Sequence, residues 1–425
     1  MNIITKIVLI NFVLLMQSAL ADTNEFLIKN GDRVVIYGDS ITDNQLYPLI
    51  IEDYVVTRWP QWNVKFWNRG WGGDTAHYYG RFQRDCLALK PTVVFICLGM
   101  NDALYKPFDQ NLFTNYVRHL DKMSKDLAVI NASLVLISPP TYDITLGPTL
   151  KNPEDLKTYD MSGYPEVLRE FSLGMLSVAT IDHCRYVDLN REYAELLATG
   201  KAKYGNSFKL TGENDPVHPK GPGQLAMAAI ILKNLNAPSS IATLAIDAGK
   251  GSVINSKGTK VSTITIDSNE LNFVRIDEAL PSPMYDGTEP ADTMLGVSER
   301  LNANIIKFEH LTPGMHRLSI DNSGIVTKSA DEWFVGVNLS SFSYTPEMKQ
   351  SQDVAQLTRQ INDLEYNKWR KILCKKIVWV GDSSSYDVSD VNALKNADKQ
   401  IADLIVKRKT IAQPKPHRYF LSRME

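Results

Sequence analysis

The stretch Tyr37-Gly38-Asp39-Ser40-Ile41-Thr42 decides how the first half of the chain is interpreted. It follows the apolar run Val34-Val35-Ile36, which predicts a strand, and precedes an amphipathic run from Asn44 that predicts a helix. A strand that breaks at glycine and serine and leads straight into a helix projects a serine hydroxyl at its carboxyl end. Open α/β sheets bind their ligands at that end. Ser40 is therefore the first candidate for a reactive side chain.

The alternation of strand and helix continues to about residue 238. The periodicity predicts further strands at 63–67, 92–98, 134–138 and 185–189. Helices are expected at 44–58, 77–89, 109–129, 165–179, 191–198 and 223–235, and a turn-rich surface loop at 142–160. Five strands that alternate with helices predict an α/β fold whose parallel sheet is covered on both faces.

The pattern changes after Pro238. Short β-like runs separated by turn residues predict an all-β texture, at 261–267, 271–276, 304–309, 316–321 and 334–339. Apolar residues at 3-4-3 spacing then predict a helix from Met348 to about Leu373, a second helical stretch is expected at 388–407, and the basic tail from Arg408 is expected to be extended or frayed.

A chain of 425 residues exceeds the roughly 250–300 residues that one hydrophobic core serves. We expect an α/β domain at 22–240, a β-rich accessory region at 241–345, and C-terminal helices with a tail at 346–425.

Residues 1–21 have the pattern of a secretory signal peptide. Lys6 supplies a positive charge, residues 7–15 are apolar apart from Asn11, and Ala19-Leu20-Ala21 offers small residues at a cleavage site. The alternative, a transmembrane anchor, needs about 20 apolar residues, which this run does not reach. The sequence therefore predicts cleavage after Ala21 and a mature protein, without a membrane span, that is secreted or periplasmic.

The charge balance argues against some partners. The formal net charge is −2, which gives no reason to expect nucleic acid or an acidic membrane as partner. The four cysteines, at positions 86, 97, 184 and 374, form no Cys-x-x-Cys pair, so no metal site is predicted. Export would permit disulfides, but the sequence leaves their presence and pairing open.

Three later turns carry residues that could assist Ser40. They are Asn68-Arg69-Gly70-Trp71-Gly72-Gly73, Gly99-Met100-Asn101-Asp102 and Asp215-Pro216-Val217-His218. With Gly38-Asp39-Ser40 they form an ordered set that resembles the SGNH, or GDSL-type, hydrolase superfamily over about residues 30–238. The resemblance implies a flavodoxin-like three-layer sandwich with a five-stranded parallel sheet, and an enzyme that needs no metal or organic cofactor.

The same residues make chemical sense as a serine hydrolase. A serine hydroxyl is a weak nucleophile and needs a base within hydrogen-bond reach. His218 is the best candidate, because Asp215 three residues earlier could orient its other ring nitrogen. The tetrahedral intermediate also needs donors for its oxyanion. By analogy with the superfamily these are the backbone amides of Ser40 and Gly73 and the side-chain amide of Asn101.

Each of these residues could also have a purely structural role. Ser40 could be a helix N-terminal residue only, the Gly70–Gly73 turn only a tight connection, and Asn101 only a turn residue. Trp71 is a candidate substrate-binding residue whose indole could stack on a sugar, or else it covers the glycine turn as a lid. A second Gly-Asp-Ser, at 381–383, follows a strand-like run but has no partner motifs downstream, so we expect it to be a helix-capping loop.

The combined prediction is a secreted serine esterase that cleaves O-acyl esters through Ser40, His218 and Asp215. The resemblance to secreted carbohydrate acetylesterases favours O-acetyl groups on carbohydrates, so the expected partner is an acylated small molecule or polysaccharide. A lipase-like or aryl esterase and an O-acyltransferase are alternatives. A non-catalytic carbohydrate-binding or surface-assembly protein is favoured instead if Ser40 and His218 do not lie within reach of each other. The oligomeric state is left open.

Overall fold

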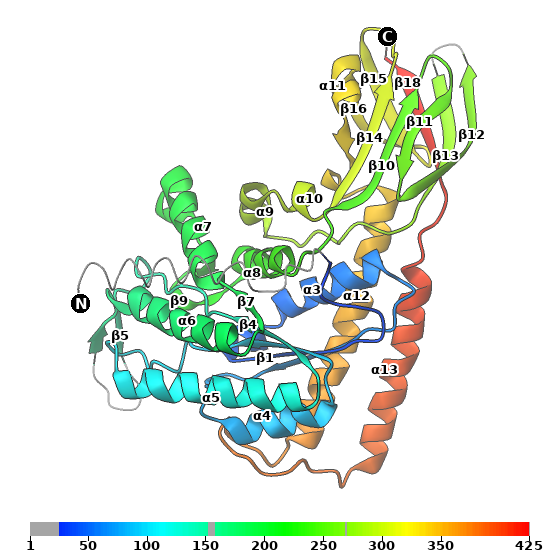
Figure 1. Ribbon diagram of the computed structural model, residues 1–425. Helices are drawn as coiled ribbons and strands as arrows, with labels where there is room; N and C mark the ends of the chain where they lie inside the picture. The colour runs from blue at the N-terminus through cyan, green and yellow to red at the C-terminus, as the bar shows by residue number, and fades with distance from the viewer. Residues whose placement is uncertain (1–24, 152–157, 268–269, 425) are drawn as a thin grey trace. The chain divides into compact units, whose positions relative to one another are not determined.

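The computed structural model describes residues 25–151, 158–267 and 270–424 (Figure 1). The expected signal peptide, residues 1–21, lies outside these ranges. The contacts divide the chain into two compact units. The first comprises the chain up to Pro48, Asn63–Ala237 and Trp369–Ser389, and the second comprises Leu49–Trp62, Pro238–Lys368 and the chain from Asp390.

A five-stranded parallel sheet organises the first unit. Its spatial order is β2-β1-β3-β4-β7. The strands are β1 (Arg33–Gly38), β2 (Lys65–Gly70), β3 (Val93–Cys97), β4 (Ser133–Ile137) and β7 (Arg185–Val187). The chain leaves β1 toward β2 and later returns to pair β3 on the other side of β1. The carboxyl end of β1 is therefore the switch point at which such sheets bind ligands.

Helices cover both faces of this sheet, as predicted. Figure 1 shows α4 and α5 on one face and α8 on the opposite face. The helices of this part of the chain are α2 (Ser40–Asp43), α3 (Leu46–Arg58), α4 (Tyr79–Asp85), α5 (Gln110–Val129), α6 (Tyr164–Ile181), α7 (Leu189–Tyr204) and α8 (Gly221–Asn234). The helix predicted at 44–58 begins later than expected, because Gln45 has a left-handed φ of +71° between α2 and α3.

Two small hairpins decorate the same unit. The segment predicted as a surface loop contains β5 (Thr149–Lys151) and β6 (Thr158–Asp160), which pair antiparallel. The second hairpin joins β8 (Thr211–Gly212) to β9 (Asp215–Pro219), so Asp215 and His218 both lie on a short strand.

The second unit has the appended all-β texture expected from the sequence. One sheet has the order β11-β10-β14-β17 and the other has the order β12-β13-β18-β15-β16. The strands are β10 (Ser240–Asp247), β11 (Ser252–Lys257), β12 (Thr259–Asp267), β13 (Glu270–Asp277), β14 (Ala303–Glu309), β15 (Met315–Ile320), β16 (Ser323–Ser329), β17 (Val337–Asn338) and β18 (His417–Arg423). A shared core of Phe273, Phe308, Trp333 and Tyr419 lies inside this unit.

Some expectations for this unit are wrong. The run predicted as a strand at 334–339 is the end of helix α11 (Ala330–Val335) followed by β17, because Ser329 and Glu332 form a capping box that starts a helix. The tail was expected to be extended or frayed, and it is extended: β18 lies between β13 and β15, and Tyr419 and Leu421 are fully buried. The other helices are α9 (Glu289–Leu295), α10 (Val297–Arg300), α12 (Pro346–Asn367) and α13 (Val391–Ile411).

The second Gly-Asp-Ser sequence is a loop but does not cap a helix. The cap of α13 is instead Asp390, whose carboxylate accepts from the amide of Ala393. The loop is held by Arg84, which donates to the carbonyls of Asp382 (2.6 Å) and Ser384 (3.1 Å). All four cysteines lie within the described ranges and none forms a disulfide. Within those ranges, no helix has the length and apolar character needed to cross a membrane.

Candidate active site

Ser40 lies at the carboxyl end of β1, as the first residue of α2. Gly38 makes this turn possible, since a Cβ there would lie 2.2 Å from Oγ1 of Thr42 and 2.6 Å from the carbonyl oxygen of Cys97. The buried carboxylate of Asp39 caps α2 by accepting from the amide of Ile41 at 2.9 Å. The Gly-Asp-Ser sequence is thus a strand-to-helix turn with Ser40 at its apex.

His218 contacts both Ser40 and Asp215. Its Nε2 lies 2.8 Å from Oγ of Ser40, and its Nδ1 lies 2.8 Å from Oδ2 of Asp215. The other oxygen of Asp215 accepts from the backbone amides of Val217 and His218, each at 3.0 Å. The three side chains form one hydrogen-bonded line, the arrangement by which an imidazole activates a serine hydroxyl.

The carboxyl of Asp215 is stabilised as an anion. Partial burial acts to raise its pKa, but the hydrogen bonds from the amides of His218 and Val217, and then the His218 ring, outweigh burial. The net pKa lies below the ordinary value of aspartate. An ionised Asp215 accepts the Nδ1 proton of His218 and leaves Nε2 free to accept the proton of Ser40.

Gln224, a residue that no motif indicated, joins the serine turn to the histidine strand. Its Oε1 accepts from the amide of Tyr47 at 2.9 Å, and its Nε2 donates to the carbonyls of Ile41 (3.2 Å) and Pro219 (3.3 Å). The side chain is 1 % exposed. Because Ile41 follows Ser40 and Pro219 follows His218, Gln224 fixes the separation of the two.

The glycine-rich turn packs directly on α2. Asn68 donates to the carbonyl of Thr42 at 2.8 Å and accepts from the amide of Gly70 at 2.8 Å. A Cβ on Gly70 would lie 2.2 Å from the amide nitrogen of Asp43, so only glycine permits this approach. Gly73, with φ +77°, needs glycine for its backbone conformation instead.

The Asn101 turn lies beside the glycine turn. Nδ2 of Asn101 donates to the carbonyl of Asp74 at 3.1 Å, and Oδ1 of Asp102 accepts from the amide of Ala76 at 2.8 Å. On the other side, a Cβ on Gly72 would lie 3.9 Å from Cβ of Ser40. The expected oxyanion donors therefore come from neighbouring turns: Ser40 adjoins Gly72-Gly73, and Asn101 adjoins Asp74.

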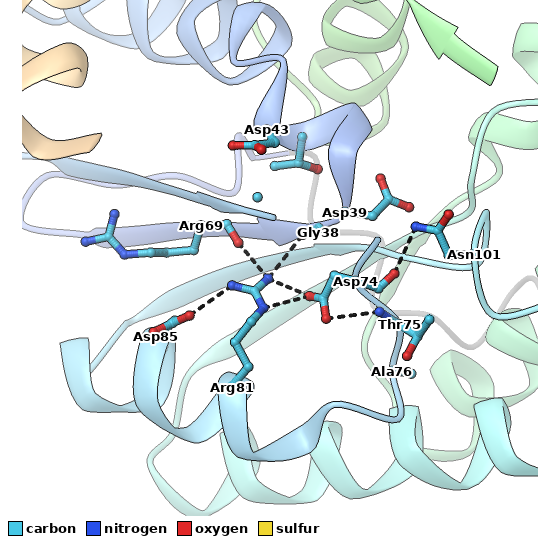
Figure 2. Close-up of polar contacts among 12 residues, drawn as sticks. Gly38, Asp39, Asp43, Arg69, Asp74, Thr75, Ala76, Arg81, Asp85 and Asn101 are labelled. Carbon is cyan, nitrogen blue, oxygen red and sulfur yellow. Dashed lines mark hydrogen bonds and ion pairs between the residues drawn. The ribbon is translucent and has the colours of Figure 1, made fainter. Parts of the chain in front are cut away.

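A buried arginine ties these turns together from below, as Figure 2 shows. Arg81 donates through Nε to Asp74 (3.0 Å) and through Nη1 to Asp85 (3.0 Å). Its Nη2 donates to the carbonyls of Gly38 (3.1 Å) and Arg69 (2.9 Å) and also reaches Asp74. Arg81 thus links the ends of β1 and β2 to the residue that follows Gly73.

Two further buried carboxyls flank the site. Burial raises the pKa of Asp39 to about 7, against the opposing hydrogen bond from Ile41, and the nearby charge of Asp74 adds to the rise. Burial also raises the pKa of Asp102 well above its ordinary value. Asp39 is therefore partly neutral near pH 7, and burial favours the neutral form of Asp102, which limits the negative charge beside a developing oxyanion.

Trp71 is buried, with 6 % of its surface exposed. The guanidinium of Arg370 lies 3.6 Å from the centroid of its ring, and Trp369 meets it edge to face at 5.7 Å. Both partners come from the segment 369–389, which returns to this unit. These contacts favour the alternative in which Trp71 packs over the glycine turn.

The α/β domain and its four turns match a sequence model of acylhydrolases. Residues 36–226 match the sequence model of the GDSL-like Lipase/Acylhydrolase family, and all four turns lie within that match. The α/β domain therefore carries a region similar to the GDSL-like lipase and acylhydrolase family, and the chain is a carboxylic ester hydrolase.

One solved structure shares the fold over nearly the whole chain, and others match about half of it, all at low sequence identity. A gut microbial diltiazem-metabolizing enzyme is 22% identical, with a TM-score of 0.78 over 94% of this chain and 99% of that chain. An acetylxylan esterase from Geobacillus stearothermophilus is 19% identical and covers 49% of this chain and 95% of its own, with a TM-score of 0.39. An α/β hydrolase from the metagenome of Lake Arreo, Spain, is 23% identical over 50% and 98% of the two chains, also with a TM-score of 0.39. No sequence among the curated proteins matches.

Proposed function

We propose that the protein is a secreted serine esterase that removes O-acyl groups, chiefly O-acetyl groups, from carbohydrates. The observation that supports serine catalysis is the pair of hydrogen bonds made by His218. Its ring bonds to the hydroxyl of Ser40 and to the carboxylate of Asp215, each at 2.8 Å. A non-catalytic binding protein would gain weight if Ser40 and His218 lay apart, and they are in contact. The acetyl-carbohydrate substrate and the secretion rest on the sequence resemblance and the leader pattern.

The mechanism follows from the three side chains. Oγ of Ser40 attacks the ester carbonyl carbon while Nε2 of His218 takes the hydroxyl proton. The oxyanion accepts from the amides of Ser40 and Gly73 and from Nδ2 of Asn101. The C–O bond to the alcohol then breaks, and His218 returns the proton to the leaving oxygen. Water, deprotonated by His218, attacks the acyl-Ser40 ester and releases the acid and the free serine.

Replacement of the nucleophile tests the mechanism. With 4-nitrophenyl acetate and with acetylated xylan, Ser40→Ala should lower kcat by about 10³-fold or more, because the covalent step is lost. The matched control is Ser383→Ala, in the second Gly-Asp-Ser sequence, which should keep the turnover of the unmodified protein. Wild-type turnover in Ser40→Ala would show that the nucleophile is misassigned.

A substrate series tests the acyl and alcohol specificity. We expect kcat/KM to be higher for acetyl than for butyryl and octanoyl esters, and higher for acetylated xylan than for simple acetate esters. Diltiazem belongs in the series, since the structural neighbour with the TM-score of 0.78 is described as metabolizing it. A maximum at octanoyl would instead establish the lipase-like alternative, and faster acyl transfer to an added alcohol than to water would establish the transferase.

A further inference from the structure

Both ends of the side-chain amide of Asn101 form hydrogen bonds. Its Nδ2 donates to the backbone carbonyl of Asp74 at 3.1 Å, as drawn in Figure 2, and its Oδ1 lies 2.9 Å from the hydroxyl of Tyr105. A carbonyl oxygen can only accept, so the NH2 group must face Asp74 and the amide oxygen must face Tyr105. The hydroxyl of Tyr105 is therefore the donor in that bond.

This pairing leaves one free donor on Asn101. The NH2 group has two hydrogens, and the carbonyl of Asp74 takes one of them. The second hydrogen is directed by the plane of the amide, and that plane is set by the two partners. We infer that Tyr105 is a positioning residue that orients Asn101 as an oxyanion donor, an inference that rests on the proposed function.

The backbone around Tyr105 is held in an unusual conformation. Leu104 and Tyr105 are consecutive residues with φ of +52° each, in the left-handed region that residues with a Cβ seldom adopt. Such a conformation is strained for a residue with a side chain, and the strain persists where the surroundings impose it. It occurs in the turn that brings the hydroxyl of Tyr105 back to Asn101.

The ring of Tyr105 is fixed by a second tyrosine. It stacks on Tyr164 with centroids 5.3 Å apart and planes at 23°. Tyr164 is itself buried and donates to the carbonyl of Met100 at 2.7 Å, next to Asn101. The hydroxyl of Tyr105 is therefore presented by a rigid ring, which keeps the donor in place while charge develops on the substrate.

The variant Tyr105→Phe removes only the hydroxyl and keeps the stacked ring. Loss of a whole oxyanion donor lowers kcat by about 10²–10³-fold. Asn101→Ala should reach that range, and Tyr105→Phe, which frees the amide to rotate, should lower kcat by roughly 10-fold with KM unchanged. The control is Tyr186→Phe, whose hydroxyl donates to the carbonyl of Ser172 at 3.1 Å, away from Asn101, and which should retain kcat.

A double variant separates positioning from general damage. If Tyr105 acts only through Asn101, adding Tyr105→Phe to Asn101→Ala should lower kcat no further. Unchanged kcat in Tyr105→Phe, or losses that multiply in the double variant, would overturn the inference while leaving the esterase assignment intact. Absence of esterase activity in the unmodified protein, or its survival in Ser40→Ala, would overturn the proposed function and this inference with it.

Discussion

Asp39 caps the nucleophile turn, and its buried carboxyl should make the stability of the protein depend on pH. Its pKa is about 7 in the folded protein, against about 3.9 for an exposed aspartate. Below about pH 4 the carboxyl is protonated in both states. Between about pH 4 and pH 7 the unfolded chain releases the proton and the folded protein keeps it, so the free energy of unfolding falls as the pH rises. The full effect is at most about 4 kcal/mol.

Asp39→Asn should reduce that dependence, because an amide still caps α2 and never ionises. We expect the urea midpoint of the variant to fall less between pH 4 and pH 8 than that of the unmodified protein. Asp109→Asn, at the exposed N-cap of α5, is the matched control and should leave the pH dependence unchanged. Parallel curves for Asp39→Asn and the unmodified protein would mean that Asp39 is ionised in the fold at these pH values.

At the scale of single residues, the sequence motifs indicated the candidate catalytic residues. They did not indicate the residues that hold these side chains in position. Asp215 and His218 were predictable as a pair because both lie on one short strand. Gln224 was not, because two of its three hydrogen bonds go to residues 177 and 183 positions away, which leaves no local signature. Arg81 and Tyr105 bond partly to nearby residues, but no motif marks either of them. Asp102 and Asp74, which neighbour the motif residues, are both buried. The catalytic roles stay predictions until the variants are measured.

At the scale of elements, the contact of α2 with the end of β2 should be intolerant of one added methyl group. In Gly70→Ala the Cβ would lie 2.2 Å from the amide nitrogen of Asp43 and 2.5 Å from the carbonyl carbon of Thr42. Both atoms are backbone, so α2 must shift and carry Ser40 with it. We expect kcat to fall by about 10-fold or more and stability to fall by about 1–3 kcal/mol.

The matched control for this prediction is Gly163→Ala, at the N-cap of α6. A Cβ there meets nothing within 4 Å and φ is −89°, so stability should change by no more than about 0.5 kcal/mol. Measured kcat and urea midpoints for the two variants give the comparison. Equal behaviour of Gly70→Ala and Gly163→Ala would show that the packing of α2 does not position Ser40.

Strands and helices of the α/β domain were largely predictable from periodicity, because each is buried on a regular face. The expected parallel order is confirmed, and the helices differ from expectation by a few residues at their ends. The β-rich part was predicted less completely. β11 is exposed along its whole length, so it lacks the apolar alternation that marks a strand. The strand-like run at 377–380 is not a strand; Val378 and Trp379 are largely exposed, at 86% and 54%.

At the scale of the whole molecule, the second unit should depend on the segment 417–423. Its strand β18 pairs with β13 on one side and β15 on the other, so its loss cuts a five-stranded sheet in two. It also removes Tyr419 and Leu421 from the core and leaves Glu347 without the hydroxyl of Tyr419, which lies at 2.5 Å. The sequence left an extended and a frayed tail both open here, because the segment from Arg408 is basic and contains proline.

A chain ending at Pro416 should therefore lose cooperative unfolding of the second unit and become sensitive to limited proteolysis between residues 238 and 345. A chain ending at Arg423 is the control, since it keeps all of β18. The measurement is the rate of cleavage by trypsin, with the fragments identified by mass. Equal resistance of the two chains would mean that β13 and β15 hold their sheets without β18.

Because β18 lies in the middle of its sheet, the sheet cannot be completed until the end of the chain has been synthesised. Residues 321–416 separate β15 from β18, and at about 5–20 residues per second the ribosome needs roughly 5–20 s to make them. During that interval the hairpins β12-β13 and β15-β16 each carry one strand edge whose partner has not been made. Such edges invite pairing with other nascent chains. The newly made chain thus passes through a period of exposure to aggregation that ends only when residues 417–423 insert between the two hairpins.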